Sequence, residues 1–530
     1  MDVSKTSYDE IPYQNDPFSQ TWPDRLAAVA KLFGLDAAPT DGCRVLELGC
    51  ASGANVIAMA QALPGSRFVG VDASSRQIAE GWRIIGALGL KNIELKHIDI
   101  LDVGEGFGEF DYVVSHGVFS WVPPAVQDRI IAICRQNLTP RGVAYVSYNT
   151  YPGWHIRGIV RDMMTYHGKQ FRDPPTQLGQ AKALVEFVVN ALPGESNPYK
   201  QLLHKELENI GGYQDAYVHH EHLEENNQPL YFHEFARKLA VNGLQYLGEA
   251  EFASMVSTNF GAEIAATLQR IGAHDILQME QYMDFVRCRT FRQTLICRAG
   301  VPLNRLLRPE LVKGFLLSSR AVPENPEPSL AVANLEVFRT PSGSGLNCRH
   351  PLTKIALRIM AREWPMPLAF PALVAASQAE ADRQGLPSEG AGAGDFLAGE
   401  MLAGMAAGVV EWRLTPPPFT TDPGEHPTTT PLARLQAAEG TKVSSLRGES
   451  IVLDGIHRHV LRHLDGTRDR AGLVEDLLAF LAEGGHTLLR EEDQSPVTDK
   501  NEMRRLLDTA SDKVLQNLAR SALLVRQGRE

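Results

Sequence analysis

Residues 1–155 predict an α/β fold built on a doubly wound parallel sheet. Short apolar runs typical of buried strands alternate with helical stretches five times within about 110 residues, which is the pattern of βαβ units. The best defined unit, residues 43–72, reads as strand, glycine turn, helix and second strand. In such sheets ligands bind outside the carboxyl ends of the strands, so we expect the functional site there.

Each part of the unit at residues 43–72 has a physical task. Residues 45–48 predict a buried strand, residues 54–63 a helix that stops at Pro64, and residues 68–71 a strand ending on Asp72. Between them, Gly49 lets the backbone pass close to a ligand, and Gly53 leaves the helix start free of a side chain. Free N–H groups at this helix start attract negative charge, so the turn is predicted to bind a ligand.

The alternation of strands and helices continues beyond Asp72. We expect helices at residues 75–88 and 124–138 and strands at residues 93–98, 112–114 and 142–148. The carboxyl ends of the five strands should form one crevice. The segments assigned to it are Glu47–Asn55, Asp72, Asp99 with Ile100, His116–Trp121 and Tyr148–His155.

The segment before the sheet is rich in aromatic residues. Tyr8, Tyr13, Phe18 and Trp22 precede a helix expected at residues 23–33. Such an arm either covers a bound ligand as a lid or packs against the domain as a strap. The sequence leaves both interpretations open.

After residue 155 the pattern changes to helices and aromatic loops. A helix at residues 232–241 and strands at residues 243–252 and 291–298 then return to the sheet pattern. We therefore expect one sheet domain formed by residues 1–155 and 231–300. Residues 156–230 are its helical insertion, which builds a second wall of the crevice or a dimer contact.

Stretches rich in proline, glycine and threonine divide the remaining chain. Residues 301–328 and 416–431 predict linkers, and residues 329–415 predict a small α/β module with a hairpin around Ser342 to Gly345. Residues 432–530 predict a mostly helical, winged-helix-like module. Acidic and basic residues are nearly balanced in this module, which disfavours DNA binding and favours protein recognition or assembly.

Composition excludes several classes of function. The 530-residue chain is too long for one core, and its net charge of −11 argues against a nucleic acid as the main partner. Its six cysteines lie apart without a C-x-x-C pair, which favours reduced, buried thiols. The polar N-terminus is no signal peptide, and the apolar window at residues 396–412 is too short to span a bilayer. We expect a cytoplasmic protein without membrane insertion.

Asp72 indicates which ligand the glycine turn binds. It ends the second strand about 20 residues after the turn, where βαβ units place the carboxylate that binds ribose hydroxyls. The sequence has no G-x-G-x-x-G, the double-glycine approach that a pyrophosphate needs. The turn therefore favours an adenosine ligand over a dinucleotide, and a βαβ turn without any ligand is the alternative.

Five phrases of the sequence carry a family resemblance: ELGCASGAN, HGVFSWVPP, YVSYNTYPGWH, HHEHLEENNQPLYFHEF and RTFRQTLICR. The chain resembles class I S-adenosylmethionine (AdoMet) methyltransferases with a methyltransferase regulatory domain, a group that includes bacterial lysine methyltransferases of outer-membrane proteins. The likeness is specific over roughly residues 8–300, and beyond residue 320 only the arrangement of modules matches. The resemblance implies a Rossmann-like AdoMet domain, dimerisation through the insertion, and methyl transfer to lysine ε-amines of a protein substrate.

The strand ends supply the expected cofactor site. The residues expected to bind AdoMet are Glu47, Gly49, Cys50, Ser52, Gly53, Asn55, Asp72, Ala73, Gln77, Asp99, Ile100 and His116. Within this set, Asp72 is expected to bind the ribose and Asp99 the adenine amino group. Glu47 and the glycine turn are expected to hold the methionine part.

Methyl transfer to an amine requires alignment of its lone pair, exclusion of water and loss of its proton. The candidate catalytic residues are His116, Tyr148, Asn149 and Trp154, and the candidate substrate-binding residues are Tyr13, Trp121, His220 and Glu221. Structural roles are the alternatives, with His116 fixing a turn and the aromatic residues forming a hydrophobic lid. The histidine run at residues 219–222 is not expected to bind a metal, because His220 and His222 diverge on a helix.

The leading hypothesis is an AdoMet-dependent methyltransferase that acts on lysines of a protein. A small-molecule N- or O-methyltransferase is the runner-up, because the crevice fits either acceptor. The non-enzyme alternative is an inactive Rossmann-like scaffold that binds protein partners.

Overall fold

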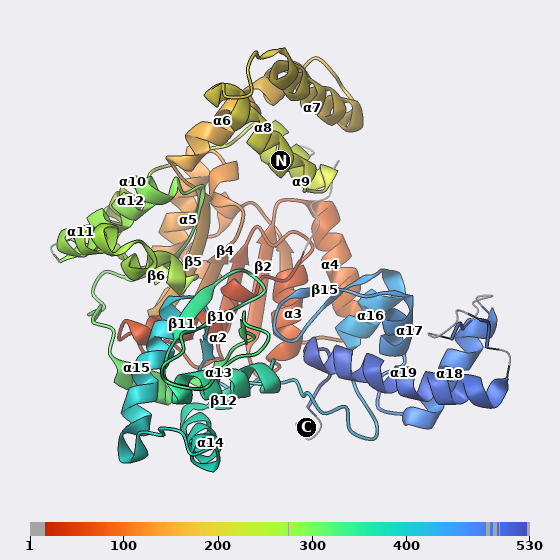
Figure 1. Cartoon of the computed structure of the whole chain (residues 1–530). Coiled ribbons are helices and arrows are strands. Elements are labelled where there is room, and N and C mark those ends of the chain that lie inside the picture. Colours follow the sequence, from red (N-terminus) through yellow and green to blue (C-terminus); the bar gives the residue numbers. More distant parts are fainter. Residues whose placement is uncertain (1–15, 274, 484–487, 491–494, 498, 527–530) are drawn as a thin grey trace.

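The computed structural model describes residues 16–273, 275–483, 488–490, 495–497 and 499–526 (Figure 1). Its centre is a seven-stranded sheet with strand order β3-β2-β1-β4-β5-β7-β6. The strands are β1 (Arg44–Leu48), β2 (Arg67–Asp72), β3 (Ile93–His97), β4 (Phe110–Ser115), β5 (Leu138–Asn149), β6 (Leu244–Glu249) and β7 (Phe291–Arg298). The first five strands are parallel, and β7 runs antiparallel to both β5 and β6. The five parallel strands confirm the predicted parallel sheet, and β7 and β6 make the sheet mixed at one edge.

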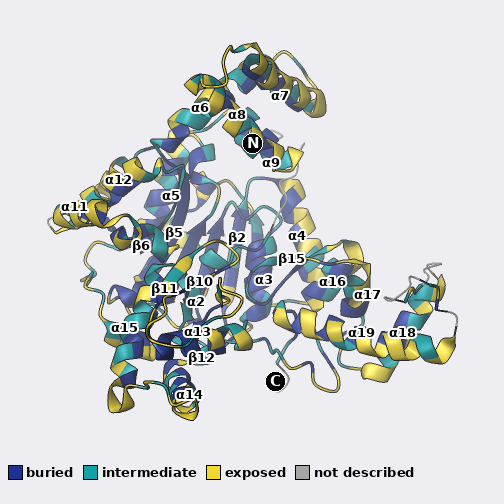
Figure 2. Ribbon diagram, viewed as in Figure 1, coloured by how far each residue is buried: buried dark blue, intermediate teal, exposed yellow. Residues whose placement is uncertain are grey.

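Helices cover both faces of this sheet (Figure 2). Val45 packs with α2 (Pro23–Leu32), α3 (Ala54–Ala62) and α4 (Ser75–Leu88), whereas the next residue, Leu46, packs with α5 (Pro124–Gln136) and α10 (Phe232–Val241). Successive side chains of a strand point to opposite faces, so a strand that is covered twice is apolar throughout. This explains why the apolar runs predict the central strands well.

The expected element ends differ from the structure by a few residues. The helix expected to reach residue 138 ends at Gln136, because Leu138 already begins β5. Asn137 marks the boundary, and its buried Nδ2 donates to the carbonyl oxygens of Gly104 and Gly108 at 3.1 and 2.8 Å. The strand expected at residues 93–98 ends at His97.

The insertion consists of four helices with a small apolar core of their own, seen above the sheet in Figure 1. They are α6 (Gly153–Gly168), α7 (Pro174–Ala191), α8 (Pro198–Gly211) and α9 (Asp215–Leu223). The chain returns to the sheet through a bridge between Thr150 and Leu230. Between β6 and β7 it forms α11 (Ala262–Gly272) and α12 (Ile276–Arg287).

A buried ionic cluster fixes the start of β7. The Arg292 guanidinium lies 2.6 Å from the Glu249 carboxylate on β6, and 3.0 and 2.8 Å from Glu280 and Asp284 on α12. Its carbon Cζ also lies 3.9 Å from the centre of the Phe232 ring of α10. Removing one partner from such a cluster leaves an uncompensated buried charge, so the four residues hold β7 in place.

Residues 301–328, expected as a linker, belong instead to the middle module. Strand β8 (Leu316–Ser318) pairs with β12 (Leu368–Ala369) and β13 (Glu411–Arg413), and β9 (Val322–Pro323) pairs with β10 (Glu336–Arg339). The predicted hairpin is formed by β10 and β11 (Gly345–Cys348). The helices of this module are α13 (Pro351–Glu363), α14 (Phe370–Arg383) and α15 (Ala393–Ala406). These pairings are long-range, which is why composition alone suggested a linker.

In its described residues, the C-terminal module combines four helices with a short hairpin. Its elements are α16 (Pro431–Glu439), β14 (Lys442–Ser444), β15 (Ser450–Val452), α17 (Gly455–Arg462), α18 (Arg470–Glu483) and α19 (Lys500–Arg520). Residues 416–431, the second expected linker, are tied to the chain end by bridges from Phe419 to Val525 and from Thr429 to Leu524. Within the described ranges, no helix is long and apolar enough to cross a membrane.

Short 3₁₀ helices complete the chain. They lie at Ser19–Thr21, Ile100–Asp102, Glu105–Phe107, Phe119–Trp121, Phe252–Met255, Ser257–Asn259, Pro309–Gly314 and Gly390–Gly392. Three of them, at Ser19–Thr21, Ile100–Asp102 and Phe119–Trp121, carry or adjoin residues that line the cavity described next.

Candidate functional site

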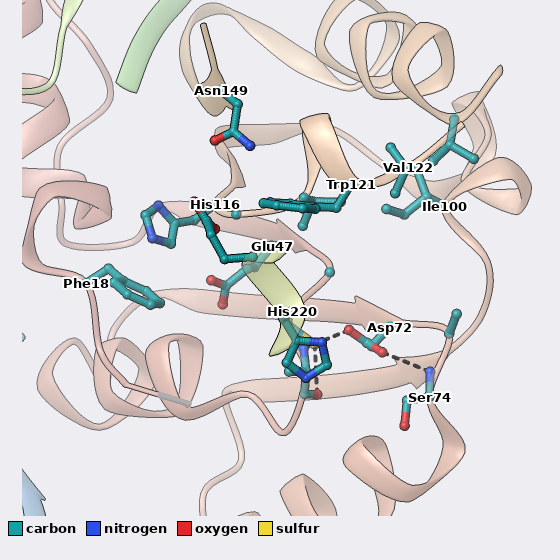
Figure 3. A pocket seen from close by; sticks show the side chains of 18 of the residues that line it. Phe18, Glu47, Asp72, Ser74, Ile100, His116, Trp121, Val122, Asn149 and His220 are labelled. Atoms are coloured by element: carbon teal, nitrogen blue, oxygen red, sulfur yellow. Dashed lines mark hydrogen bonds between the residues drawn. The ribbon is translucent and has the colours of Figure 1, made fainter. Parts of the chain in front are cut away.

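A cavity of about 720 Å³ lies at the carboxyl ends of the central strands (Figure 3). Of the predicted site residues, it is lined by Glu47, Gly49, Cys50, Asp72, Ala73, Gln77, Asp99, Ile100, His116, Trp121, Asn149, His220 and Glu221. The structure therefore brings together residues from five strand ends and from α9 of the insertion. Its volume lies within the range of roughly 300–1,000 Å³ that small-molecule pockets occupy.

The glycine turn forms the floor of the cavity. Gly49 has φ +71° and Gly53 has φ +78°, conformations that residues with a side chain rarely adopt. A methyl group on Gly49 would come within 2.5 Å of the Val118 side chain. The backbone N–H groups of Gly49 and Cys50 both donate to the Val71 carbonyl, which ties the turn to β2.

Glu47 is buried beneath this turn. Its Oε1 accepts a hydrogen bond of 2.8 Å from Asn55 Nδ2, while its buried Oε2 has no hydrogen-bond partner in the described part of the chain. Burial raises the pKa of Glu47 to about 7 and outweighs the hydrogen bond from Asn55, which lowers it. An unpaired carboxylate oxygen is costly in a buried place, so this atom suits a ligand that carries a donor.

Asp72 holds the rim of the turn. Its Oδ2 accepts a hydrogen bond of 2.8 Å from Ala51 N, and its Oδ1 accepts one of 2.8 Å from Ser74 N (Figure 3). Asp99 accepts from Leu101 N at 2.9 Å and starts the 3₁₀ helix that presents Ile100. The backbone thus fixes both carboxylates at neighbouring strand ends, the geometry suited to a ribose and an adenine ring.

His116 lies in an aromatic corner of the cavity. Its Nδ1 is 2.9 Å from the Tyr145 hydroxyl, and its ring centre is 4.0 Å from that of Phe18 and 6.4 Å from that of Phe291. Burial lowers the pKa of His116 to about 4, so the imidazole is neutral at pH 7. The corner offers a neutral, apolar surface beside the carboxylates of the floor.

The wall opposite the floor comes from the insertion. Glu221 on α9 is bonded to Arg157 on α6 at 3.3 Å, and both line the cavity with Tyr213, Tyr217 and Trp121. Burial raises the pKa of Glu221 to about 7, although the charge of Arg157 acts in the opposite direction. Carboxylates and aromatic rings together favour a cationic or amine-bearing ligand.

Several predicted site residues do not line the cavity. Tyr148 points to the opposite face of β5, where its ring lies 4.2 Å from that of Phe235, so it is not placed for catalysis. Trp154 is buried behind Trp121, with ring centres 6.1 Å apart. Ser52 and Gly53 belong to the turn beneath the cavity, and Asn55 lies in the first turn of α3. Tyr13 lies outside the described residues.

Other residues line the cavity that the sequence patterns did not indicate. These include Phe18, Gln20, Arg157, Tyr213, Tyr217, Thr290, Phe291 and Gln293. Of these, Phe18 was weighed only as part of a lid or strap. Tyr145 does not line the cavity but contacts His116, and a signal for it did exist, because residues 145, 147 and 149 share one face of β5 and Asn149 reaches the cavity. For Tyr213, which follows α8, and Tyr217 on α9 no comparable signal was available.

The histidine run lies on α9. His219, His220 and Glu224 each place one possible ligand atom within 4.8 Å of the others, and His220 Nδ1 is 2.7 Å from Glu224 Oε1. His219 Nε2 is 3.2 Å from Gln177 Oε1. The expectation that the run binds no metal stays a prediction.

Three family models match the chain. Residues 46–144 match "Methyltransferase domain", residues 214–298 match "Predicted methyltransferase regulatory domain", and residues 425–523 match "PKMT, C-terminal winged helix domain", where PKMT denotes protein lysine methyltransferase. The first match covers most of the parallel part of the sheet. The second covers α9, β6 and β7, and the third covers the C-terminal module.

Similar proteins span the whole chain. Protein RP789 of Rickettsia prowazekii is 34% identical over 98% of this chain and 93% of its own length. The structure of PKMT2 from Rickettsia typhi in complex with AdoHcy superposes with a TM-score of 0.86 at 31% identity, covering 97% of this chain and all of that one. A structure of PKMT2 from Rickettsia typhi whose title names no ligand gives a TM-score of 0.87 at 30% identity and the same coverage.

Proposed function

This chain belongs to the PKMT family of AdoMet-dependent methyltransferases, and we propose that it methylates lysine side chains of a protein substrate. The observation that carries the proposal is the continuity of the cavity. One space of about 720 Å³ joins the carboxylates at the strand ends to the acidic and aromatic wall of the insertion. A cofactor and an amine acceptor can therefore come into contact within this one cavity.

The carboxylates and the apolar side chain on the floor of the cavity fit AdoMet. The buried, unpaired Oε2 of Glu47 suits the amino group of a methionine tail, Asp72 suits the ribose hydroxyls, and Asp99 with Ile100 suits the adenine. No phosphate-binding double-glycine approach is needed for such a ligand. When bound, AdoMet supplies an electrophilic methyl group on a sulfonium.

The residues of the insertion would then receive the acceptor. Glu221 is our candidate for the group that takes the proton of the amine, since a carboxyl with a pKa of about 7 is well matched to neutral pH. Trp121 and Tyr217 would orient the ammonium group by cation–π attraction. Neutral His116 and Asn149 would help to shape the space between the two walls and exclude water.

The resemblance to the family supports proposals for the acceptor, the location and the assembly. We propose an outer-membrane or surface protein as substrate, modified in the cytoplasm, and a homodimer formed through the insertion. Large apolar side chains that are exposed on α6, α7 and α8 support the dimer: Ile159, Tyr166, Phe187 and Tyr199. We also retain the proposed domain limits at residues 1–155 with 231–300, 156–230 and 432–530. Sedimentation at micromolar concentration tests the dimer, and a monomer would contradict it.

Calorimetric titration with AdoMet, repeated with NAD, tests the cofactor. We expect binding of AdoMet alone, followed by transfer of labelled methyl groups to lysines of a protein but not to lysine-free variants. Failure to bind AdoMet would remove the basis of the site assignment. Transfer to small metabolites only would keep the cofactor but overturn the protein acceptor.

A further inference from the structure

A short segment separates the cofactor cavity from the C-terminal module. It comprises residues 16–22, which hold one 3₁₀ helix at Ser19–Thr21 and are otherwise irregular. Phe18 and Gln20 line the cavity, so this segment forms part of its wall. Irregular backbone with few contacts of its own takes its position from its neighbours, and here it has neighbours on two sides.

The inner side of the segment rests on the floor of the cavity. The Phe18 N–H donates to Asn55 Oδ1 at 2.9 Å, and Asn55 Nδ2 donates to Thr21 Oγ1 at 3.0 Å and to Glu47 Oε1 at 2.8 Å. The Phe18 ring lies against His116, with ring centres 4.0 Å apart (Figure 3). One buried amide thus joins the segment to the carboxylate beneath the proposed cofactor.

The outer side of the segment is held by the β14–β15 hairpin of the C-terminal module. Lys442 Nζ on β14 lies 2.7 Å from Asp16 Oδ2, and the Ser450 hydroxyl on β15 donates to Asp16 Oδ1 at 2.7 Å. Gly448, in the turn between them, packs so closely on Trp22 that a methyl group there would lie 2.6 Å from the indole. Both oxygens of Asp16 are therefore engaged by one hairpin, 426 and 434 residues away in the chain.

From these two sets of contacts we propose that the β14–β15 hairpin is a positioning element of the cofactor site. It fastens residues 16–22 from outside, so that Phe18 stays against His116 and closes the cavity over the methionine end of the cofactor. The C-terminal module then contributes to retention of AdoMet without touching it. A wall that is fixed before binding saves the ordering cost that a loose segment would incur when the ligand arrives. This inference rests on the proposed AdoMet-binding function.

The test removes the outer tie and leaves every cavity residue unchanged. In the full-length double variant Lys442→Ala/Ser450→Ala, we expect Kd and KM for AdoMet to rise about fivefold, the effect of losing hydrogen bonds of ordinary net strength, with faster cofactor dissociation. We expect kcat at saturating AdoMet to stay unchanged. Glu439→Gln is the matched control, because it removes the charge from another contact of the same module, the 2.9 Å ion pair with Arg83 on α4, which involves no residue of the segment 16–22.

Repeating the double substitution in a Phe18→Ala protein shows whether the change in AdoMet affinity depends on Phe18. If the hairpin acts by positioning Phe18, the double variant should have little further effect in a Phe18→Ala protein, and the two changes should be non-additive. Full additivity, or an unchanged Kd in the double variant, would overturn the proposal. Circular dichroism and thermal unfolding verify that the variants are folded, and Asp16→Ala provides an independent break of the same tie. If the unmodified protein does not bind AdoMet, the proposed function is contradicted instead.

Discussion

The two walls of the cavity are built by different means. The floor comes from residues 47–100, where successive loops at the ends of β1, β2 and β3 hold carboxylates by backbone N–H groups. The insertion wall comes from α6 and α9, where Arg157 and Glu221 hold each other through side chains. The floor is therefore set by local backbone geometry, and the wall by the packing of distant helices.

This difference indicates how the floor and the insertion wall, the two halves of the cavity, can vary. A floor fixed by backbone can keep one ligand while its surroundings change. A wall made of side-chain pairs on an insertion can change its acceptor through a few substitutions. The two halves should consequently fail separately when they are mutated, and the following experiments test that separation.

The largest effect is expected on the floor. Asp72→Ala removes two backbone hydrogen bonds and the proposed ribose contacts, so AdoMet affinity should fall by more than about a hundredfold. Calorimetric titration measures this loss, and circular dichroism should show an intact fold. Asp102→Ala is the control, because this exposed aspartate lies on the same 3₁₀ helix as Ile100 but outside the cavity. An unchanged AdoMet affinity of the Asp72 variant would mean that Asp72 does not bind the ribose.

On the insertion wall, Glu221→Gln should affect the acceptor alone. We expect kcat/KM for the protein substrate to fall about a hundredfold, the usual range for a lost general base, while Kd for AdoMet stays within about twofold. Glu206→Gln serves as the control, since Glu206 also faces Arg157, at 4.0 Å, but does not line the main cavity. A weaker binding of AdoMet in the Glu221 variant would show that the two halves are coupled.

The pH dependence of AdoMet affinity probes Glu47. With a pKa of about 7 in the free protein, this carboxyl is neutral at pH 6 and must lose its proton to pair with a cationic amino group. Affinity should therefore fall as the pH drops below 7, by about tenfold per pH unit. Glu47→Gln should remove this slope. Titrations between pH 5.5 and 7 provide the comparison, and a flat wild-type profile would contradict the pairing.

The smallest effect concerns two tyrosines of β5. Tyr148 faces the core, where its hydroxyl accepts a hydrogen bond of 3.3 Å from Thr294 Oγ1. Tyr148→Phe should therefore leave kcat and both KM values unchanged and alter the free energy of unfolding by less than about 1 kcal/mol. Tyr145→Phe removes the 2.9 Å contact with His116 and should lower kcat. Steady-state kinetics of the pair test this, and equal losses in both variants would mean that the cavity face of β5 is assigned wrongly.

The same contrast explains which parts the sequence could predict. Strand ends of a parallel sheet meet at one edge by topology, so Glu47, Asp72, Asp99 and Asn149 could be assigned to one crevice from their positions alone. Tyr148 was assigned to the crevice because it lies at the end of a strand, without regard to the alternation of side chains along the strand. In the structure its side chain points away from the cavity and packs on Phe235. Tyr213 and Tyr217 depend on how α8 and α9 pack, which no local pattern specifies.

Phe18 and Trp22 illustrate a subtler limit. The sequence offered a lid or a strap as alternatives, whereas the structure divides the two roles between the residues. Phe18 faces the cavity and Trp22 packs on Gly448. Because the partner of Trp22 lies more than 400 residues away, only the assembled molecule reveals the division.

The distance along the chain between Asp16 and its partners also bears on biosynthesis. Lys442 and Ser450 leave the ribosome 426 and 434 residues after Asp16, a delay on the order of 20 to 90 s at typical rates of translation. All strand-end residues are made within that interval, but the contacts of Asp16 with Lys442 and Ser450 form only at its end. A nascent chain should therefore complete its cofactor pocket only when synthesis of the last module is under way.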